Sequence, residues 1–312
     1  MKIIASTNLT SVKKHSLNAL TVIFRIFLFT TLAFVVIYPI LTSISASFMS
    51  VSDVYNSSVQ YLPKNATLGN YIDLWEKLDL GRSFTTTLQY VVLISLLQMS
   101  SATLVGYGLA RFRFKLNKPL FIIAIASLAI PPTLFLIPLY KIFASFDIFG
   151  IVKLISGSPA NLLNSQWCMI LLAITATGYR CGLYIILMRQ YFRGVPKELE
   201  EAAYIDGAGT VRTFLTIMLP NARTMMITLF LFSFVWTWLD SDFAPTLMYD
   251  MPLLLNKFDL IKSILMSVSN GETLKGLYCD TAIVLTIIPL VILYMFTQRF
   301  FVQSVERSGL VG

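Results

Sequence analysis

Long stretches without charged residues alternate with short charged segments along this chain. A helix needs about 20 mostly apolar residues to cross a hydrocarbon layer roughly 30 Å thick. Six windows lack Asp, Glu, Lys and Arg and approach or exceed that length: 26–52, 83–110, 119–140, 154–179, 224–239 and 281–298. They predict six membrane-spanning helices, or five if the fourth or fifth window is only a buried helix. The fourth window continues beyond Arg180 to Met188.

The composition agrees with this pattern. Only 13% of the 312 residues are charged and the mean hydropathy is +0.73, whereas a soluble domain carries roughly a quarter charged residues. These values exclude a disordered chain, a collagen-like repeat and a disulfide scaffold. They predict an all-α, polytopic integral membrane protein.

The net charge of +8 is unevenly distributed among the segments between the windows. With the N-terminus inside, the inner segments hold 15 basic residues (Lys and Arg) and 5 acidic residues. The outer segments hold 8 basic and 11 acidic residues. Basic residues concentrate on the cytoplasmic side of membrane proteins. The asymmetry therefore predicts a multi-pass protein of the bacterial cell membrane with both termini cytoplasmic, and it explains the positive charge without nucleic acid.

The first window could be mistaken for a signal peptide, because Lys13 and Lys14 precede it and small residues follow at 43–47. Its apolar run of about 20 residues is longer than the usual 7–15-residue signal core. We expect it to remain as the first transmembrane helix.

Residues for common catalytic chemistry are missing from the sequence. It has one histidine, His15, three cysteines without a C-x-x-C pair, and no G-x-x-x-x-G-K-[ST] phosphate loop. We predict no catalytic residue, metal or cofactor, and we expect any ATP hydrolysis to occur on another subunit.

The inner segment 194–220 carries the most specific pattern. Pro196 suits the first position of a helix, and three glutamates between 198 and 201 complement the positive end of the helix dipole. Gly207 and Gly209 can adopt the left-handed geometry that ends a helix, and Thr210 suits the N-cap of the next. The segment predicts two short helices with a tight turn, too polar to cross the membrane.

The spacing within this segment resembles the E-A-A-x3-G-x9-I-x-L-P signature of ABC importer permeases. The resemblance implies a type I ABC importer permease architecture in which this loop docks a short coupling helix on a cytoplasmic ATPase. The residues that it assigns to the loop are Glu201, Ala202, Ala203, Asp206, Gly207, Ile217, Leu219 and Pro220.

Further segments are similar to the carbohydrate branch of that family, as in the second permease of maltose-type systems. They include 106–112, 136–140 and 189–192. Two positions depart from the branch: Leu239 stands where Asn is expected, and the C-terminus differs. The resemblance implies a second permease subunit, an ATPase dimer, an extracytoplasmic solute-binding protein and a sugar as cargo, besides the membrane lipid.

Four residues are candidates for the substrate path. Arg180 lies about 12 Å from the inner end of the fourth window, and an ionised side chain at that depth marks a pathway, a cavity or a structural partner. Trp236, Trp238 and Asp240 cluster at the outer end of the fifth, where aromatic faces and a carboxylate suit a sugar. The alternative for the tryptophans is an interfacial aromatic belt. Pro131, Pro132 and Pro138 are expected to break the third span, and Pro289 the sixth.

Together these patterns predict a transport subunit with three parts. Residues 1–82 form the N-terminal tail, first span and first outer loop; residues 83–298 form the transmembrane core; and residues 299–312 form a cytoplasmic tail. One alternative keeps the family but imports a peptide, polyamine or amino acid. Others are an integral-membrane transferase, which would need clustered acidic residues or histidines, and a secondary transporter or channel.

Overall fold

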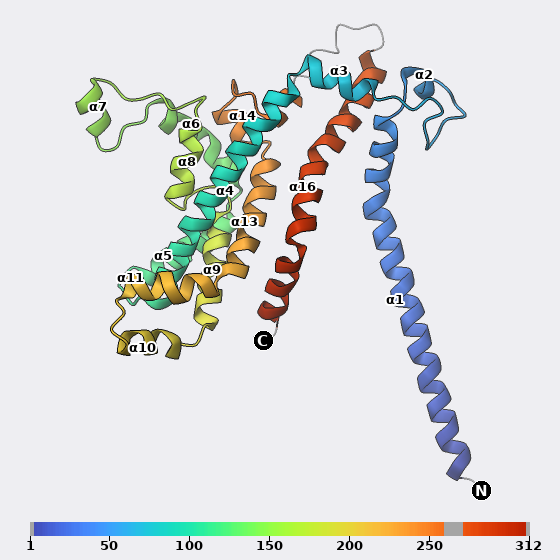
Figure 1. Ribbon diagram of the computed structural model, residues 1–312, viewed down its shortest axis with the longest axis horizontal. Coiled ribbons are helices and arrows are strands. Elements are labelled where there is room, and N and C mark those ends of the chain that lie inside the picture. The colour runs from blue at the N-terminus through green and yellow to red at the C-terminus, as the bar shows by residue number, and fades with distance from the viewer. Residues whose placement is uncertain (1–2, 259–270, 310–312) are drawn as a thin grey trace. The chain divides into compact units, whose positions relative to one another are not determined.

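The computed structural model describes residues 3–258 and 271–309 of the chain. Within them every regular element is helical, and the one β-bridge joins Phe146 to Ala160 (Figure 1). The all-α prediction is confirmed. The chain divides into two compact units, residues 1–74 with 264–287 and residues 75–263 with 288–312.

The first unit contains the long helix α1 (Ile3–Ser47), the short α2 (Val51–Val54), most of α3 (Gly69–Lys77) and the first half of α16 (Gly271–Gly309). Asn70, at the start of α3, donates hydrogen bonds from Nδ2 to the carbonyl oxygens of Ser47 and Met49, both at 2.9 Å. The hydroxyl of Tyr278 donates to the Asp73 carboxylate at 2.6 Å. These contacts attach α3 to the end of α1 and to α16.

The second unit holds the remaining elements and is the part in which the candidate sites lie. Its helices are α4 (Leu80–Arg111), α5 (Asn117–Ala129), the 3-10 turn η1 (Pro132–Phe135), α6 (Leu136–Ala144), α7 (Ile151–Ser156), α8 (Trp167–Ile174), α9 (Cys181–Gly194), α10 (Glu198–Ile205), α11 (Thr210–Thr213), the π-helical turn η2 (Phe214–Met218), α12 (Leu219–Asn221), α13 (Arg223–Trp238) and α14 (Phe243–Leu247).

Helix α4 is the centre of this unit and packs against α8, α9 and α13. At Gly106 the backbones of α4 and α9 approach so closely that a Cβ added to the glycine would lie 2.5 Å from the Cβ of Met188 on α9. Buried polar side chains join the other neighbours: Ser101 donates to the Ala173 carbonyl and Ser233 to the Gln98 side chain, both at 2.6 Å. A glycine contact and satisfied polar pairs are typical of helix packing in membranes.

The third predicted span is broken near Pro131 and Pro132 as expected, whereas Pro138 lies inside α6 and does not break it. Helix α5 ends at Ala129, Pro131 precedes η1, Pro132 is its first residue, and the chain bends by 108° between 117–129 and 132–144. Proline lacks the N–H that a continuing helix requires. A second bend, of 73°, separates 210–221 from α13.

The predicted break at Pro289 is wrong, and the fourth window is not one continuous helix. In that window α7 ends at Ser156, Gly157 follows with φ +79°, a loop containing Pro159 leads to α8, and the chain turns again between α8 and α9. Pro289, in contrast, lies inside the uninterrupted α16. One missing backbone hydrogen bond is tolerated there because the rest of a 39-residue helix continues on both sides.

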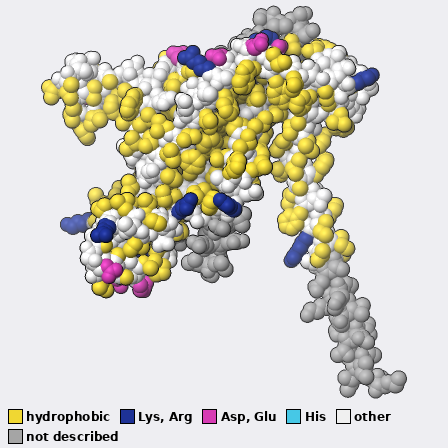
Figure 2. Space-filling model, in the orientation of Figure 1, with side chains coloured by type: hydrophobic (Ala, Val, Ile, Leu, Met, Phe, Trp, Pro, Cys, Tyr) yellow, Lys and Arg dark blue, Asp and Glu magenta, His cyan; other side chains and the backbone are white. Residues whose placement is uncertain are grey.

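Apolar side chains cover the outer sides of the helices in both units (Figure 2). Phe27 and Phe29 on α1 are more than two-thirds exposed, as is Ile137 on α6. Within the described residues, three helices are long and apolar enough to cross a membrane, at 20–47, 80–111 and 276–300, and each bent pair supplies another candidate. Such surfaces suit lipid or another membrane subunit.

Candidate functional site

The helix α10 ends in a motif that explains the spacing of its signature residues. The N–H of Ala208 donates to the carbonyl of Ala203 at 2.9 Å, and the N–H of Gly207 donates to that of Tyr204 at 3.1 Å. This pair of bonds is the Schellman motif, which requires a left-handed residue one position after the C-cap. Gly207 supplies it with φ +80°, four residues after Ala203. The left-handed prediction holds for Gly207, whereas Gly209 has φ −74°.

A buried ion pair attaches α10 to α4. Glu200 Oε2 lies 3.1 Å from Arg111 Nε, and both side chains are at most one-tenth exposed. The Tyr107 hydroxyl donates to the other carboxylate oxygen at 2.9 Å, and Arg111 also donates to the Val195 carbonyl at 2.7 Å. These bonds fix the first turn of α10 to the last two turns of α4.

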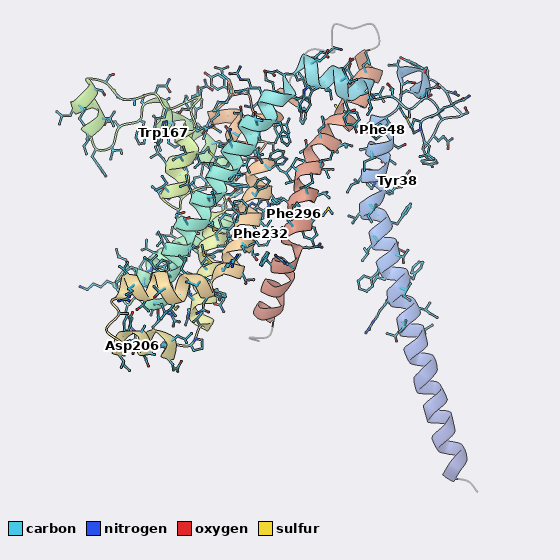
Figure 3. The ribbon with its side chains drawn as sticks, viewed as in Figure 1. Tyr38, Phe48, Trp167, Asp206, Phe232 and Phe296 are labelled. Carbon is cyan, nitrogen blue, oxygen red and sulfur yellow. The ribbon has the colours of Figure 1, made fainter. Side chains whose placement is uncertain are left out.

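The two faces of α10 differ in exposure. Ala203 is buried toward the neighbouring elements, whereas Glu201, Ala202 and Asp206 are exposed. Ile205 is 86% exposed in the isolated chain. Figure 3 shows Asp206 at the turn that leaves α10. The helix therefore presents carboxylates and large apolar side chains to its surroundings, of which Ile205 is the most exposed.

The last three signature residues lie beyond the turn. Ile217 and Leu219 are half-buried and pack against the core around Met218, and Pro220 is exposed at the start of α12. The π-helical turn at 214–218 is followed by a bend of 73°, so the segment 210–221 runs at an angle to α13 at the N-terminal end of that helix. The predicted helix pair with a tight turn is thus present, with α11, η2 and α12 as its second arm.

Arg180 occupies the break between α8 and α9. It has φ +60°, a left-handed conformation that few non-glycine residues adopt, and it immediately precedes α9. Its guanidinium carbon lies 4.2 Å from the centre of the Trp236 ring and 4.8 Å from that of Tyr179. The arginine is exposed, so the remaining guanidinium N–H groups are accessible. The described contacts of this cation are aromatic faces, a cation–π arrangement.

Trp236 and Trp238 face different surroundings, because they are two residues apart on α13. Trp236 is half-buried. Its ring stacks on those of Tyr184 and Phe232, with the ring centres 6.0 Å and 5.8 Å apart. Trp238 is 1% exposed and stacks on Phe234 at 5.8 Å. Trp238 therefore contributes to the core of the unit.

Asp240 closes the end of α13. Its carboxylate accepts hydrogen bonds from the backbone N–H groups of Asp242, Phe243 and Ala244 at 2.9–3.1 Å. Burial raises the pKa of the Asp240 carboxyl, and the three N–H donors oppose that rise. The side chain shapes the turn into α14 and is 8% exposed.

The structure thus brings Arg180 and Trp236 together and gives Trp238 and Asp240 buried positions. The sequence alone does not predict the ion pair of Glu200 with Arg111, although Arg111 lies in the segment 106–112 that is similar to the carbohydrate branch. Within residues 3–258 and 271–309, no three His, Cys, Asp or Glu side chains gather in a group that could hold a metal ion.

Apolar helices, broken spans and a polar helix hairpin joined to the central helix define a polytopic membrane protein, and the hairpin has the residue spacing of a permease subunit. Residues 102–307 match the family described as "Binding-protein-dependent transport system inner membrane component". Since this match covers about two-thirds of the sequence, the chain belongs to that family, as its signature loop predicted.

Individual relatives extend over most of the chain. The melibiose/raffinose/stachyose import permease protein MelC of Bacillus subtilis is 29% identical, over 82% of this chain and 85% of the relative. The maltodextrin transport system permease protein MalD of Streptococcus pneumoniae is 27% identical, over 97% of this chain and 98% of the relative. The fold matches a chain of a bacterial ABC transporter involved in import of the acidic polysaccharide alginate, with a TM-score of 0.69 and 23% sequence identity. The match covers 89% of this chain and 95% of that chain.

Proposed function

We propose that this chain is one of two permease subunits of an ATP-driven sugar importer, with ATP hydrolysed on a separate cytoplasmic ATPase dimer. The observation that carries the proposal is the orientation of α10. Its inner side is held by Glu200 and Ala203, while Glu201, Ala202 and Ile205 remain exposed. A rigid short helix with an apolar tip and acidic neighbours suits docking into a cleft of another protein.

The same arrangement suggests how a movement would be transmitted. A displacement of α10 acts on Arg111 and Tyr107 through Glu200, and so on α4. Helix α4 is packed against α9 at Gly106, so the two helices shift as one body. Rigid-body rotation of this kind is a common way to switch a site between two accessible sides. In the proposed orientation α10 and both termini are cytoplasmic.

The proposed cargo is a sugar or oligosaccharide delivered by an extracytoplasmic binding protein. The names of the similar proteins support this class: melibiose, raffinose, stachyose and maltodextrin for permeases, and alginate for the similar structure. Within the chain we assign the path contact to Arg180 and Trp236, because an indole face and accessible guanidinium N–H groups complement the C–H face and the hydroxyls of a sugar ring. Trp238 and Asp240 would support this region from the core side.

The docking assignment is tested by changing the exposed side of α10 in the assembled transporter. Ala202→Arg adds a bulky charge on that side, and Arg212→Glu serves as a comparison at an exposed position on α11. We expect Ala202→Arg to remove the co-purifying ATPase and transport while membrane insertion stays normal. Wild-type ATPase association and uptake in Ala202→Arg would refute the assignment.

The cargo is tested separately by uptake of radiolabelled solutes in cells that express the whole transporter. We expect an oligosaccharide to be taken up and peptides, polyamines and amino acids to be excluded. Arg180→Gln should lower sugar uptake at least tenfold while the ATPase still co-purifies. Unchanged uptake in Arg180→Gln would remove this residue from the path, and uptake of an amino acid instead of a sugar would overturn the cargo.

A further inference from the structure

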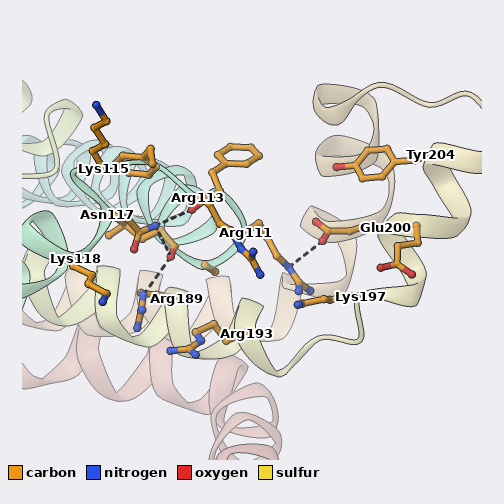
Figure 4. Close-up of a pocket in the computed structure, with 15 residues that line it drawn as sticks. Arg111, Arg113, Lys115, Asn117, Lys118, Arg189, Arg193, Lys197, Glu200 and Tyr204 are labelled. Atoms are coloured by element: carbon orange, nitrogen blue, oxygen red, sulfur yellow. Dashed lines mark hydrogen bonds and ion pairs between the residues drawn. The ribbon is translucent and has the colours of Figure 1, made fainter.

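A basic pocket lies between the end of α4, the loop that follows it, α9 and the start of α10. Its volume is about 860 Å³, and it is lined by residues 109–115, 117, 118, 189, 193, 197, 200, 201 and 204 (Figure 4). Seven of the lining side chains are Lys or Arg and two are Glu, an excess of five positive charges. All the lining residues belong to the second compact unit.

Internal pairing accounts for only part of this charge. Arg111 is paired with Glu200, which leaves Glu201 as the single remaining carboxylate of the lining. The other lining cations include Arg113, Lys118 and Arg193, whose side chains are exposed to solvent. Like charges gathered around one concave space repel one another, and the repulsion is relieved when an anion enters. The charge distribution therefore favours an anionic occupant.

One cation of the pocket is held in a fixed orientation. The Arg189 guanidinium carbon lies 3.7 Å from the centre of the Phe121 ring, and Nε donates to the Leu109 carbonyl at 3.4 Å. The terminal nitrogens of this guanidinium, whose planar fork matches a phosphate or carboxylate, are not used by that contact. Figure 4 shows Arg189 on the same side of the pocket as Lys118 and Arg193, with Lys115 pointing away from Glu200.

Apolar side chains line another part of the same pocket. Phe112 and Phe114 are 45% and 44% exposed, in the loop between the candidate span at 80–111 and the bent helix pair that begins at residue 117. Aromatic residues at such positions are typical of the membrane interface. The pocket thus combines a set of cations that can pair with a phosphate and an exposed aromatic edge of the kind found beside lipid head groups.

We propose that this pocket binds the phosphate of an anionic ligand, and that an anionic phospholipid of the cytoplasmic leaflet is its occupant. Basic pockets on the cytoplasmic side of membrane helices recognise anionic head groups in this way. Because α10 supplies Glu200, Glu201 and Tyr204 to the same pocket, the ligand contacts α4, α9 and α10 together. Its binding stabilises one position of α10 relative to α4.

The test measures lipid binding to the purified full-length protein in phosphatidylcholine nanodiscs. Phosphatidylglycerol is titrated and bound lipid is counted by native mass spectrometry. Arg113→Gln with Arg193→Gln removes two exposed pocket cations, and Arg212→Gln with Arg223→Gln removes two exposed cations elsewhere in the same unit. We expect the pocket pair to weaken binding by about fivefold for each cation removed and the matched pair to leave it unchanged.

A second pair, Arg113→Lys with Arg193→Lys, keeps the charge and should retain most of the affinity, which separates loss of charge from loss of folding. Inorganic phosphate is titrated in parallel. Pocket-dependent binding of phosphate alone would support the anion site but assign it to a soluble ligand. Equal loss in both glutamine pairs, or no preference for phosphatidylglycerol over phosphatidylcholine, would overturn the proposal. The assay does not require transport, so its result is independent of the proposed cargo.

Discussion

The guanidinium of Arg180 lies over the indole ring of Trp236, 4.2 Å from its centre, although 56 positions separate the two residues in the chain. Arg180 has a left-handed backbone at the break between α8 and α9, and its side chain contacts α13. The pair joins the start of α9 to α13, the two elements that carry the candidate path residues Arg180 and Trp236. The interaction energy of the pair can be measured.

A double-mutant cycle on this pair should reveal coupling. Arg180→Gln and Trp236→Leu each remove the cation–π contact, which contributes about 0.5–2 kcal/mol depending on its exposure to water. We expect the double variant to be destabilised by less than the sum of the two single variants, measured by thermal unfolding of the purified protein. Trp236→Phe, which keeps an aromatic face, is the control and should retain part of the coupling. Strictly additive effects would show that the contact is energetically irrelevant.

Gly207→Ala should weaken the end of α10. A Cβ at Gly207 would meet no atom within 4 Å, so the effect comes only from the backbone, where φ +80° costs an L-residue about 1–2 kcal/mol. Gly209→Ala is the matched control, because φ −74° is open to alanine and a Cβ there also meets nothing within 4 Å. Limited proteolysis at the α10–α11 turn should be faster in Gly207→Ala alone. Equal cleavage rates in both variants would contradict the Schellman assignment.

Glu200→Gln should be strongly destabilising, whereas Glu201→Gln should not. Removing one member of a buried ion pair costs about 3–5 kcal/mol, and changes at exposed sites usually stay within about 0.5 kcal/mol. The relevant difference is that Glu200 lies 3.1 Å from Arg111 while Glu201 is exposed. The unfolding temperature of the purified subunit reports the stability effect. In the transporter, Glu201→Gln should instead lower ATPase association, so the two neighbouring glutamates have opposite phenotypes.

Gly106→Ala should disrupt the packing of α4 against α9, while Gly108→Ala should be tolerated. The added Cβ at position 106 would lie 2.5 Å from the Met188 Cβ and 3.0 Å from the Arg189 backbone nitrogen. At position 108 the nearest atom is 3.9 Å away, on the Phe112 ring. Overpacking costs about 1–3 kcal/mol, whereas alanine in a free helical site can gain up to about 1 kcal/mol. Thermal unfolding of the two variants gives the comparison, and similar temperatures would refute the close contact.

The sequence predicted the class of fold and the signature loop because both depend on local patterns. Apolar windows follow from the thickness of the bilayer, and Gly207 ends α10 through its own backbone. Interruptions were harder to predict: the charge-free window at 154–179 contains loops that Gly157 and Pro159 introduce, whereas Pro289 leaves α16 intact. Apolar content measures partition into lipid and does not report where a backbone turns.

Contacts between distant segments were not predictable in the same way. Tyr107 and Glu200 are 93 residues apart, and no local periodicity relates them. Likewise, Trp236 and Trp238 look equivalent in the sequence, but a step of two residues on a helix rotates a side chain to a different neighbour. The structure is needed to assign one to the Arg180 contact and the other to the core.

The contact at Gly106 also constrains where a solute can travel. The α4 and α9 backbones leave no room for a methyl group at this level, so no sugar can pass between these two helices. Any conduit must run along another side of the bundle. In the proposed transporter, the second permease would supply the opposite wall of that conduit.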